Sequence, residues 1–336
     1  MNWFYKIAAV LSCFGLLSCE QIIFEENQMS DDPKVNFEYL WNEIDANYSY
    51  FELKDLNWNE VYDYYSKKID ARMSEQELFD VLASMMDTLR DDHANLITPF
   101  DVSRYNLPLR KNPNYRKRTV EEYYVPNMKI TGSFSHGYIK DHEIPYIRYE
   151  SFANQIDEAS LDHIIDMYSG DIFMILDLRE NGGGSLENVP LLLERFNINP
   201  VPYAYSITRN GPNHDDFSNP EPLYILGNNP IKYKYRLFIL LDRGSYSATN
   251  FLAVCAKSMH NVFLVGDTTG GGGGLPNGGQ LPNGWTYRCS VSQVLDLDGN
   301  NHAENGVPPD FLAKFDWNDI TKDEVIEKVI ELTYTL

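Results

Sequence analysis

The spacing of apolar residues divides the chain into two parts. Between residues 31 and 98 these residues recur every three or four positions, which is the pattern of helices that bury one face. Helices are predicted from the start signal Asp32-Pro33, over residues 58–69, and from the capping-box spacing of Ser74 and Glu77. This part is therefore expected to be an N-terminal helical bundle.

From residue 143 to the C-terminus, short apolar runs alternate with helical patterns. Such alternation predicts an α/β or α+β fold with a mixed central sheet. Strands are expected over residues 144–152, 171–178, 236–242 and 262–265, and from 285 to 295 after an Asn283-Gly284 turn; helices are expected over 186–196 and 248–259, and from the capping-box spacing of Thr321 and Glu324 to Leu332. Residues 99–142 show neither pattern and are expected to be an irregular connector.

The first 19 residues have the pattern of an export signal. Lys6 precedes an apolar stretch over residues 7–17, which is too short to span a membrane. The stretch ends in LLSC, which resembles the lipobox of bacterial lipoproteins, so Cys19 is expected to be lipidated and residues 20–30 to form a tether. The alternative is an ordinary secretory signal with a chance cysteine. Either reading places the mature protein outside the cytoplasm, and lipidation would anchor it in the cell envelope, facing the periplasm or the cell surface.

The balance of charges narrows the class of partner. The chain has 336 residues, with 49 Asp and Glu against 28 Lys and Arg, a net charge of −21. Nucleic-acid binding requires clustered basic residues, so no nucleic-acid partner is expected. Because 43% of the residues are hydrophobic, a chain of this length can bury a sizeable core.

No metal or cofactor site is expected. Cys255 and Cys289, the two cysteines of the folded part, could pair in an oxidising compartment or remain as buried thiols. Neither has the CxxC spacing of a zinc site. The run DLDGN at 296–300 begins like a calcium loop, but Asn301 and Val307 occupy the positions that require Gly and Glu.

Three segments at the ends of predicted elements could carry chemistry. DLRENGGGS at 177–185 runs from a buried strand into a glycine turn, which suits an oxyanion. In DRGSYSATN, at 242–250, Ser247 has the position of a nucleophile at a helix N-terminus, although it or Ser245 could simply cap the helix. In LRDDHANL, at 89–96, His93 could be only a partner of the helix dipole.

Four motifs in order resemble the tail-specific, or C-terminal-processing, protease family. They are DLRENGGG, DRGSYSATN, VGDTTGGG and ENGVPPD, which together cover about residues 143–312, with LRDDHANL upstream. The resemblance implies a mixed-sheet core of the crotonase-like type over 143–336, with Ser247 as nucleophile. It also implies an oxyanion hole formed by Gly183 and Ala248. Asn250 departs from the family pattern, which has Glu there.

The general base implied by the resemblance is a histidine. In the Ser-Lys branch of the family a lysine lies 25 residues after the nucleophile, but here that position is Gly272, and Lys257 is too far along its helix. The tricorn-like branch uses a histidine that matches His93. By the same resemblance Asp92 could orient the imidazole, and Glu304 is a loosely aligned carboxylate of the site.

The sequence therefore predicts a lipid-anchored serine peptidase that acts on peptides or unfolded proteins. Its alternative is a non-catalytic binding module on the same fold, like the retinoid-binding modules that resemble this family. An envelope scaffold without a pocket is disfavoured by the glycine-rich loops. Residues 99–142 are too few for a complete PDZ domain, the part that holds substrate C-termini in many relatives, so selectivity for C-termini is not implied.

Overall fold

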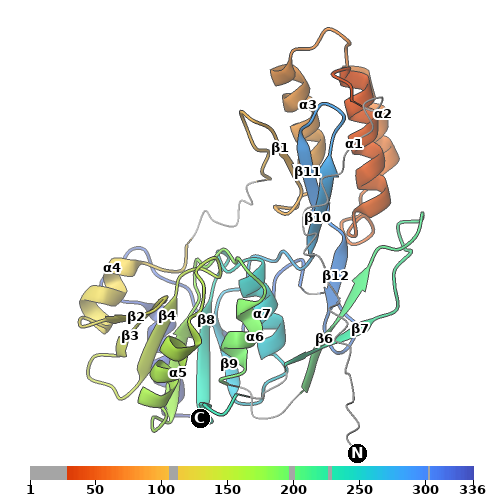
Figure 1. Ribbon diagram of the computed structural model, residues 1–336. Coiled ribbons are helices and arrows are strands. Elements are labelled where there is room, and N and C mark those ends of the chain that lie inside the picture. Colours follow the sequence, from red (N-terminus) through yellow and green to blue (C-terminus); the bar gives the residue numbers. More distant parts are fainter. Residues whose placement is uncertain (1–28, 106–112, 197–200, 226–228, 302) are drawn as a thin grey trace, which may run out of the picture.

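The computed structural model describes residues 29–105, 113–196, 201–225, 229–301 and 303–336. The predicted signal segment and most of the predicted tether lie outside these residues. The described chain forms two packed units, one mainly helical and one built on a seven-stranded sheet (Figure 1). No helix among the described residues is long and apolar enough to cross a membrane.

The helical unit begins as the apolar spacing predicts. Its helices are α1 (Pro33–Asn47), α2 (Trp58–Tyr65, extended by a 3-10 turn over Ser66–Lys68) and α3 (Glu75–Asp87). The Asp32 side chain accepts a hydrogen bond from the Lys34 amide at the start of α1. Ser74 and Glu77 form both hydrogen bonds of a capping box at the start of α3. These helix starts are thereby confirmed.

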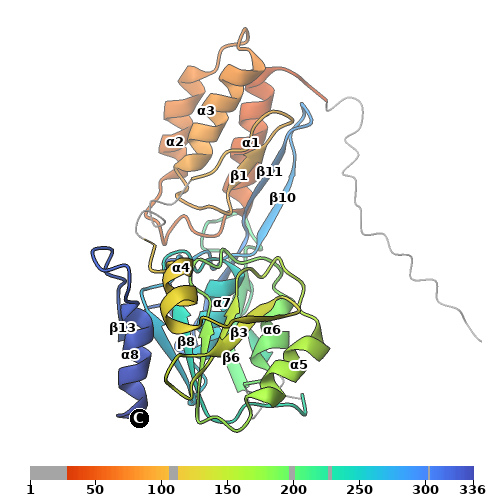
Figure 2. The same ribbon diagram turned by 90° about the vertical axis from the view of Figure 1, so that its left-hand side faces the viewer.

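A hairpin from the second half of the chain completes the helical unit. Its strands are β10 (Pro276–Gln280) and β11 (Thr286–Ser290), and β11 pairs antiparallel with β1 (Asn95–Ile97). Trp285 and Tyr287 are buried in the same apolar cluster as the three helices. Figure 2 shows the hairpin rising from the sheet unit to lie against α1.

The prediction of one strand from residue 285 to 295 is wrong. The chain breaks at Val291, and β12 (Ser292–Leu295) joins a second small sheet with β6 (Val201–Thr208) and β7 (Glu221–Ile225). The change of sheet lets Val294 enter the cluster of the large sheet, whereas Val291 still packs against the cluster of the helical unit.

The larger unit contains the mixed sheet that the alternating pattern predicts. Its strand order is β13-β9-β8-β5-β4-β3-β2, parallel from β13 to β4 and antiparallel beyond. The strands are β2 (Lys129–Thr131), β3 (Phe134–Tyr138), β4 (Pro145–Tyr149), β5 (Phe173–Asp177), β8 (Arg236–Leu241), β9 (Val262–Gly266) and β13 (Phe311–Leu312). The predicted mixed α/β fold is confirmed.

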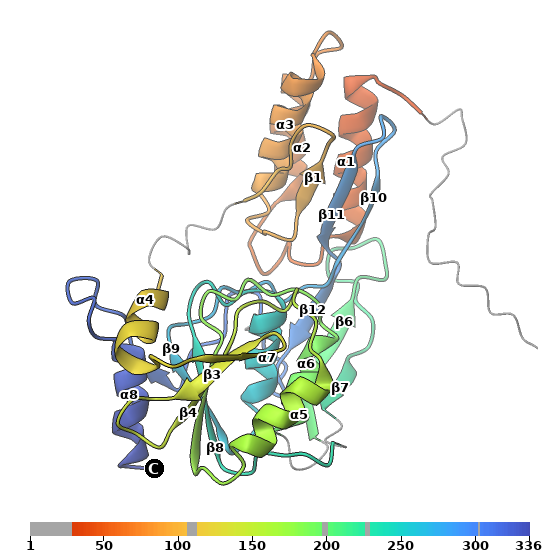
Figure 3. The ribbon, with the colours of Figure 1, turned by 60° about the vertical axis from the view of Figure 1, so that its left-hand side comes forward.

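Helices cover both faces of this sheet, as Figure 3 shows. One face carries α5 (Glu158–Met167), α6 (Asn188–Leu193) and α7 (Ala248–Ala256), and the other carries α4 (Lys117–Thr119), with the π-helical turn Val120–Tyr124, and α8 (Glu324–Thr333). In β8 the side chains alternate between the two apolar clusters: Leu237 and Ile239 face α7, and Phe238 faces α8. Both faces of the central strands are therefore buried, which explains their continuous apolar runs.

Two boundaries differ from the sequence prediction. Residues 99–142 are not wholly irregular, because α4, β2 and β3 lie in them, and β2 and β3 extend the large sheet. These elements are only three to five residues long, too short to give a period. The final helix is capped by Asp323, whose carboxylate accepts from the amides of Val325 and Ile326, and not by Thr321, whose hydroxyl donates to Asp319.

The hairpin makes the helical unit dependent on the far half of the chain. Trp285 is buried against the rings of Phe79 and Phe100. We expect Trp285→Ala to lower the free energy of unfolding by about 3–5 kcal/mol, because it empties a large aromatic site in the core. Urea unfolding followed by circular dichroism measures the change. The control Tyr334→Ala, at a ring that is 78% exposed, should change the value by about 0.5 kcal/mol or less. A Trp285→Ala loss as small as the control's would contradict the prediction.

Candidate active site

Ser247 and His93 come from different units and meet at a cleft between them. Ser247 immediately precedes α7 at the end of the loop after β8, and His93 lies in the turn between α3 and β1. The His93 Nε2 atom is 3.0 Å from the Ser247 Oγ atom. At that distance the hydroxyl can transfer its proton to the imidazole without rearrangement.

The backbone of Ser247 is held in a strained conformation. Its φ of 55° and ψ of −118° lie in a region that L-residues rarely adopt, at a cost of about 1–3 kcal/mol. Its side chain forms no capping hydrogen bond to α7. Ser245 donates instead to the Leu178 carbonyl and accepts from the Asp242 amide. Neither serine side chain therefore serves as the helix cap, and the Ser247 hydroxyl faces His93.

The imidazole of His93 is buried and polarised by charges on two sides. Burial lowers its pKa below the ordinary value, Asp91 acts in the opposite direction, and Arg288 lowers the pKa further. Asp91 is also the residue that fixes the turn, because its carboxylate accepts from the His93 amide at 2.8 Å and from the Ser290 hydroxyl at 2.8 Å. The sequence placed Asp91 beside His93 but gave no reason to select it.

Neither Asp92, which was expected to orient the imidazole, nor Glu304, the other carboxylate expected at the site, hydrogen-bonds to the ring. Asp92 lines the cleft beside His93, and Glu304 lies on the far side of the glycine-rich loop. The Nδ1 atom of His93 is buried and has no side-chain hydrogen-bond partner within the described chain, while the backbone of Gly274 acts on the ring and raises its pKa. The structure therefore brings Ser247 and His93 together and does not bring Asp92 or Glu304 onto the ring.

Glu304 forms a buried ion pair with a lysine that sequence reasoning missed. The Lys54 Nζ atom lies 2.6 Å from Glu304 Oε1 and 3.0 Å from the Arg90 carbonyl oxygen, and the second Glu304 oxygen accepts from the Gly273 amide at 3.1 Å. Lys54 thus joins the loop before His93 to the glycine-rich loop. Burial raises the pKa of Glu304 to about 7, with Asp91 acting in the same direction and Lys54 against it. No sequence motif marks Lys54.

The glycine turn expected to hold an oxyanion lies directly against the nucleophile. A Cβ atom on Gly183 would be 2.8 Å from Ser247 Cβ and 2.9 Å from the Ala248 nitrogen, so only glycine fits. The Gly183 amide, however, donates to the side-chain oxygen of Asn181 at 3.0 Å. The Ala248 amide, at the first position of α7, has no acceptor among the described residues. Ala248 is therefore the available donor of the expected pair.

Gly272 occupies the position of the lysine in the Ser-Lys branch, and a side chain does not fit there. Gly272 has a φ of 78°, and a Cβ atom there would lie 2.5 Å from the Tyr246 ring. Lys257 pairs with Asp310 at the opposite end of α7. Neither position can supply an amine to Ser247.

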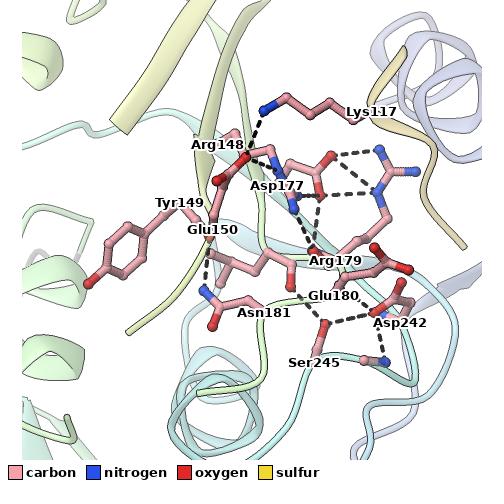
Figure 4. Close-up of polar contacts among 12 residues, drawn as sticks. Lys117, Arg148, Tyr149, Glu150, Asp177, Arg179, Glu180, Asn181, Asp242 and Ser245 are labelled. Atoms are coloured by element: carbon pink, nitrogen blue, oxygen red, sulfur yellow. Dashed lines mark hydrogen bonds and ion pairs between the residues drawn. The ribbon is translucent and has the colours of Figure 1, made fainter. Parts of the chain in front are cut away.

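A buried network of charges supports the loops on either side of the nucleophile (Figure 4). Asp177, at the end of β5, accepts from both Arg148 and Arg179, and Arg179 also pairs with Asp323 at 3.0 Å. Burial alone would raise the pKa of Asp177, but the two arginines hold it below the ordinary value. The network fixes the strand end from which the glycine turn departs.

Two further side chains tie this turn to the nucleophile loop. Asp242 accepts from the Glu180 amide at 2.8 Å and from the Gly244 amide at 2.9 Å, as Figure 4 shows in part. Asn181 donates to the Tyr149 carbonyl. These contacts join the ends of three parallel strands, the place where open α/β sheets carry their sites.

Asn250, which departs from the family pattern, has a structural partner at each end of its amide. Its nitrogen donates to the Ala303 carbonyl at 2.7 Å, and its oxygen accepts from the Thr269 hydroxyl at 2.6 Å. The side chain is fully buried. Asn250 therefore fastens α7 to the segments that carry the glycine-rich loop and Glu304.

The cleft has a volume of about 860 Å³. Its wall toward the helical unit mixes the polar Asn95, Arg104 and Arg288 with the apolar Ile97, Val102 and Leu275. Its wall over the sheet unit is apolar, formed by Leu186, Pro190, Tyr203, Leu223, Phe251 and Val294. Among the described residues no group of three or more His, Cys, Asp or Glu side chains could hold a metal ion, and Cys255 and Cys289 are buried free thiols.

Fold and sequence together define a member of a serine peptidase family. The profile of Peptidase family S41 matches residues 143–313, and the profile of the Tricorn protease C1 domain matches residues 29–87. The chain belongs to peptidase family S41, which confirms the tail-specific protease family expected from its motifs.

Individual relatives agree with this assignment. The carboxy-terminal processing protease CtpB of Bacillus subtilis is 25% identical over 177 residues, which are 52% of this chain and 35% of that protein. The chain thus spans about a third of the length of the curated relatives that it matches. A candidate peptidase of Parabacteroides merdae is 35% identical, with a TM-score of 0.85 over 90% of this chain and 97% of that one. Mature CPAF shares the fold at 13% identity, with a TM-score of 0.67 over 90% and 96% of the two chains.

The Lys54–Glu304 pair should couple stability to pH. We expect Lys54→Met to lower the free energy of unfolding by about 3–5 kcal/mol, because it leaves a buried carboxylate without its cation. The double variant Lys54→Met/Glu304→Gln should recover most of this loss. Urea unfolding of both variants and wild type gives the coupling. Equal losses in the single and double variants would contradict the assignment.

The sign of the pH effect follows from the pKa of Glu304. Removing Lys54 raises this pKa above the wild-type value of about 7. As the pH rises, burial of the ionising Glu304 lowers the free energy of unfolding until the pH passes the folded-state pKa. This decline ends near pH ~7 in wild type but continues to higher pH in the variant, so the loss of stability caused by Lys54→Met should be larger near pH ~8.5 than near pH ~6. Lys257→Met is the matched control: its pair with Asp310 is about one-third exposed and should contribute about 1 kcal/mol or less.

Proposed function

We propose that the chain is a serine peptidase that hydrolyses peptide bonds through an acyl-enzyme on Ser247, with His93 as general base. The observation that carries the proposal is the 3.0 Å contact between His93 Nε2 and Ser247 Oγ. Family membership supports the reaction class, and the names of the relatives suggest processing of C-termini. The closed position at Gly272 supports histidine over lysine as the base.

Each residue has a definite part in the proposed reaction. The Ser247 oxygen attacks the substrate carbonyl as its proton passes to His93 Nε2. The Ala248 amide stabilises the resulting oxyanion. His93 then returns the proton to the departing amine, which leaves the acyl group on Ser247. Water, deprotonated by His93, hydrolyses the ester in the second half of the reaction.

The peptidase proposal is tested on the full chain with a mixed peptide library. Ser247→Ala and His93→Ala should each reduce kcat/KM by about 10⁴-fold or more, since the two groups act as a unit. Because burial lowers the pKa of His93, the neutral imidazole and hence the activity of wild type should persist below pH ~6.5. Mass spectrometry of the products measures the rates.

The control for this experiment is His260→Ala, at an exposed histidine that does not line the cleft. It should retain wild-type activity. Full activity in His93→Ala would overturn the assignment of the base. A folded wild type that cleaves nothing would favour the alternative of a binding module.

We propose further that lipid on Cys19 anchors the protein outside the cytoplasm. The proposal rests on the LLSC pattern after an apolar stretch of signal length. In a bacterial host grown with labelled palmitate, wild type should carry label. Cys19→Ala should lose it, while the control Cys13→Ala, within the apolar stretch, should not. Label that survives Cys19→Ala would refute the lipid anchor.

A further inference from the structure

A second cavity lies beside the helix that follows the nucleophile. It has a volume of about 300 Å³. A cavity of roughly 150 Å³ holds a benzene ring, so this one has room for a large apolar side chain. Its wall includes the apolar residues Tyr203, Val254, Leu297, Ala303, Val307 and Pro308, and the remaining lining residues are polar or charged. None of the residues assigned to the proposed reaction lines it.

One face of α7 connects this cavity with the catalytic cleft. Four residues, spaced by four, three and four positions, lie on the same side of the helix and of the turn after it: Ser247, Phe251, Val254 and Ser258. The first two line the cleft, and the last two line the second cavity. Since a helix rises about 1.5 Å per residue, the second cavity extends from about 10 Å to about 16 Å beyond Ser247 along the axis.

The small sheet opposite α7 connects the two cavities in the same way. Tyr203, on β6, lines both of them, and its ring packs edge-on against Phe251 with 5.6 Å between the ring centroids. On β12, which pairs with β6, Val294 lines the cleft. Asp296, two residues later, lines the second cavity. The two cavities are therefore successive parts of one groove between α7 and the small sheet.

Buried hydrogen bonds hold the wall of the second cavity in place. The Asn250 amide on α7 donates to the Ala303 carbonyl at 2.7 Å. The Thr269 hydroxyl donates to the Asn250 oxygen at 2.6 Å and accepts from the Val307 amide at 2.6 Å. Ala303 and Val307, which line the cavity, are thus fixed to α7. Asn250, the residue that departs from the family pattern, supports this cavity.

The direction of the groove identifies the part of the substrate that it faces. His93 belongs to the helical unit and must protonate the departing amine, so the leaving group lies toward that unit. The acyl part of the substrate extends the other way. From its contact with His93, α7 runs into the sheet unit and away from the helical unit (Figure 1). An extended peptide spans about 3.3 Å per residue, so 10–16 Å corresponds to about three to five residues.

We infer that the second cavity is a subsite for an apolar side chain of the substrate, three to five residues before the cleaved bond. The inference rests on the proposed peptidase function and specifies its substrate. Continuity with the cleft through Tyr203 and α7 favours a part of the same substrate over a separate small molecule. Burial of apolar surface in the cavity supplies the binding free energy.

The test uses matched peptides that differ in one side chain. A library peptide that wild type cleaves is synthesised with Leu or with Asn, which is similar in size but polar, at the third, fourth or fifth residue before the cleaved bond. At one of these positions the kcat/KM of the Leu peptide should exceed that of the Asn peptide by about tenfold or more. Equal cleavage of the two peptides at all three positions would overturn the subsite.

Two variants of the cavity then test its role. Ser258→Phe fills the cavity from a partly exposed position, and Leu297→Asp places a charge on its wall at a side chain that is 44% exposed. Each should reduce the preference for Leu to about twofold or less. The ratio within each variant cancels any change in the reaction at Ser247.

The matched control is Ser169→Phe. Its hydroxyl donates to the carbonyl three residues earlier in the turn after α5, as the Ser258 hydroxyl does after α7, and it does not line the cavity. This variant should keep the preference of wild type. A preference that persists in both Ser258→Phe and Leu297→Asp, or that falls equally in Ser169→Phe, would overturn the subsite.

Photo-crosslinking separates failure of the subsite from failure of the peptidase. Library peptides with one benzoylphenylalanine near the N-terminus are irradiated with Ser247→Ala, and the crosslinked residues are mapped by mass spectrometry. Crosslinks to residues 254–258 or 296–308 should form, and adding Ser258→Phe should remove them. This readout requires no cleavage. If wild type cleaves nothing but these crosslinks form, the proposed reaction fails and the binding site stands; if they are absent, the subsite fails.

Discussion

The contact between His93 and Ser247 joins two units whose cores are separate. Apolar burial holds each unit together, but it is non-directional and does not fix one unit against the other to within hydrogen-bond tolerance. Directional contacts do so here. Lys54, in the helical unit, pairs with Glu304 across the boundary and holds the turn before His93, and inside the helical unit the pairing of β1 with β11 sets the register of the strand that follows His93. The proposed chemistry therefore depends on polar contacts between the units as well as on the site residues themselves.

The loop that carries Ser247 has a different requirement: its backbone must be held in a conformation that it would not adopt alone. The strain at Ser247 persists only where neighbouring contacts over-determine the backbone. Asp242 bonds amides on both sides of the site, and the Asp177–Arg179 pair fixes the strand end beneath them. Buried ion pairs of this kind add little to the net free energy of unfolding, but removing one partner lowers it strongly, because the other charge is left buried and unpaired. The network thus makes displacement of the loops unfavourable.

Signals in the sequence predicted the helices, the alternation of the large sheet and the two residues that meet at the candidate site. Ser74 with Glu77 marked a helix start, and ordered motifs selected Ser247 and His93. Long-range pairing was beyond such signals. Nothing near Lys54 shows that it meets Glu304, 250 residues later. The occupied amide of Gly183 was missed for a different reason: its acceptor, the Asn181 side chain, is only two residues away, but the orientation of that side chain depends on contacts with Tyr149 and Phe152 that the sequence does not show.

The crossing of the hairpin into the helical unit has a consequence for how the protein is made. Synthesis runs from the N-terminus, so α1, α2 and α3 emerge long before the strand that completes their core. His93 then lacks both Arg288 and the strand that orders its turn. The nucleophile emerges earlier than the hairpin but after the histidine. The candidate site is thus assembled only when nearly the whole chain is present, and a partly translated or truncated product lacks the contact on which the proposed cleavage rests.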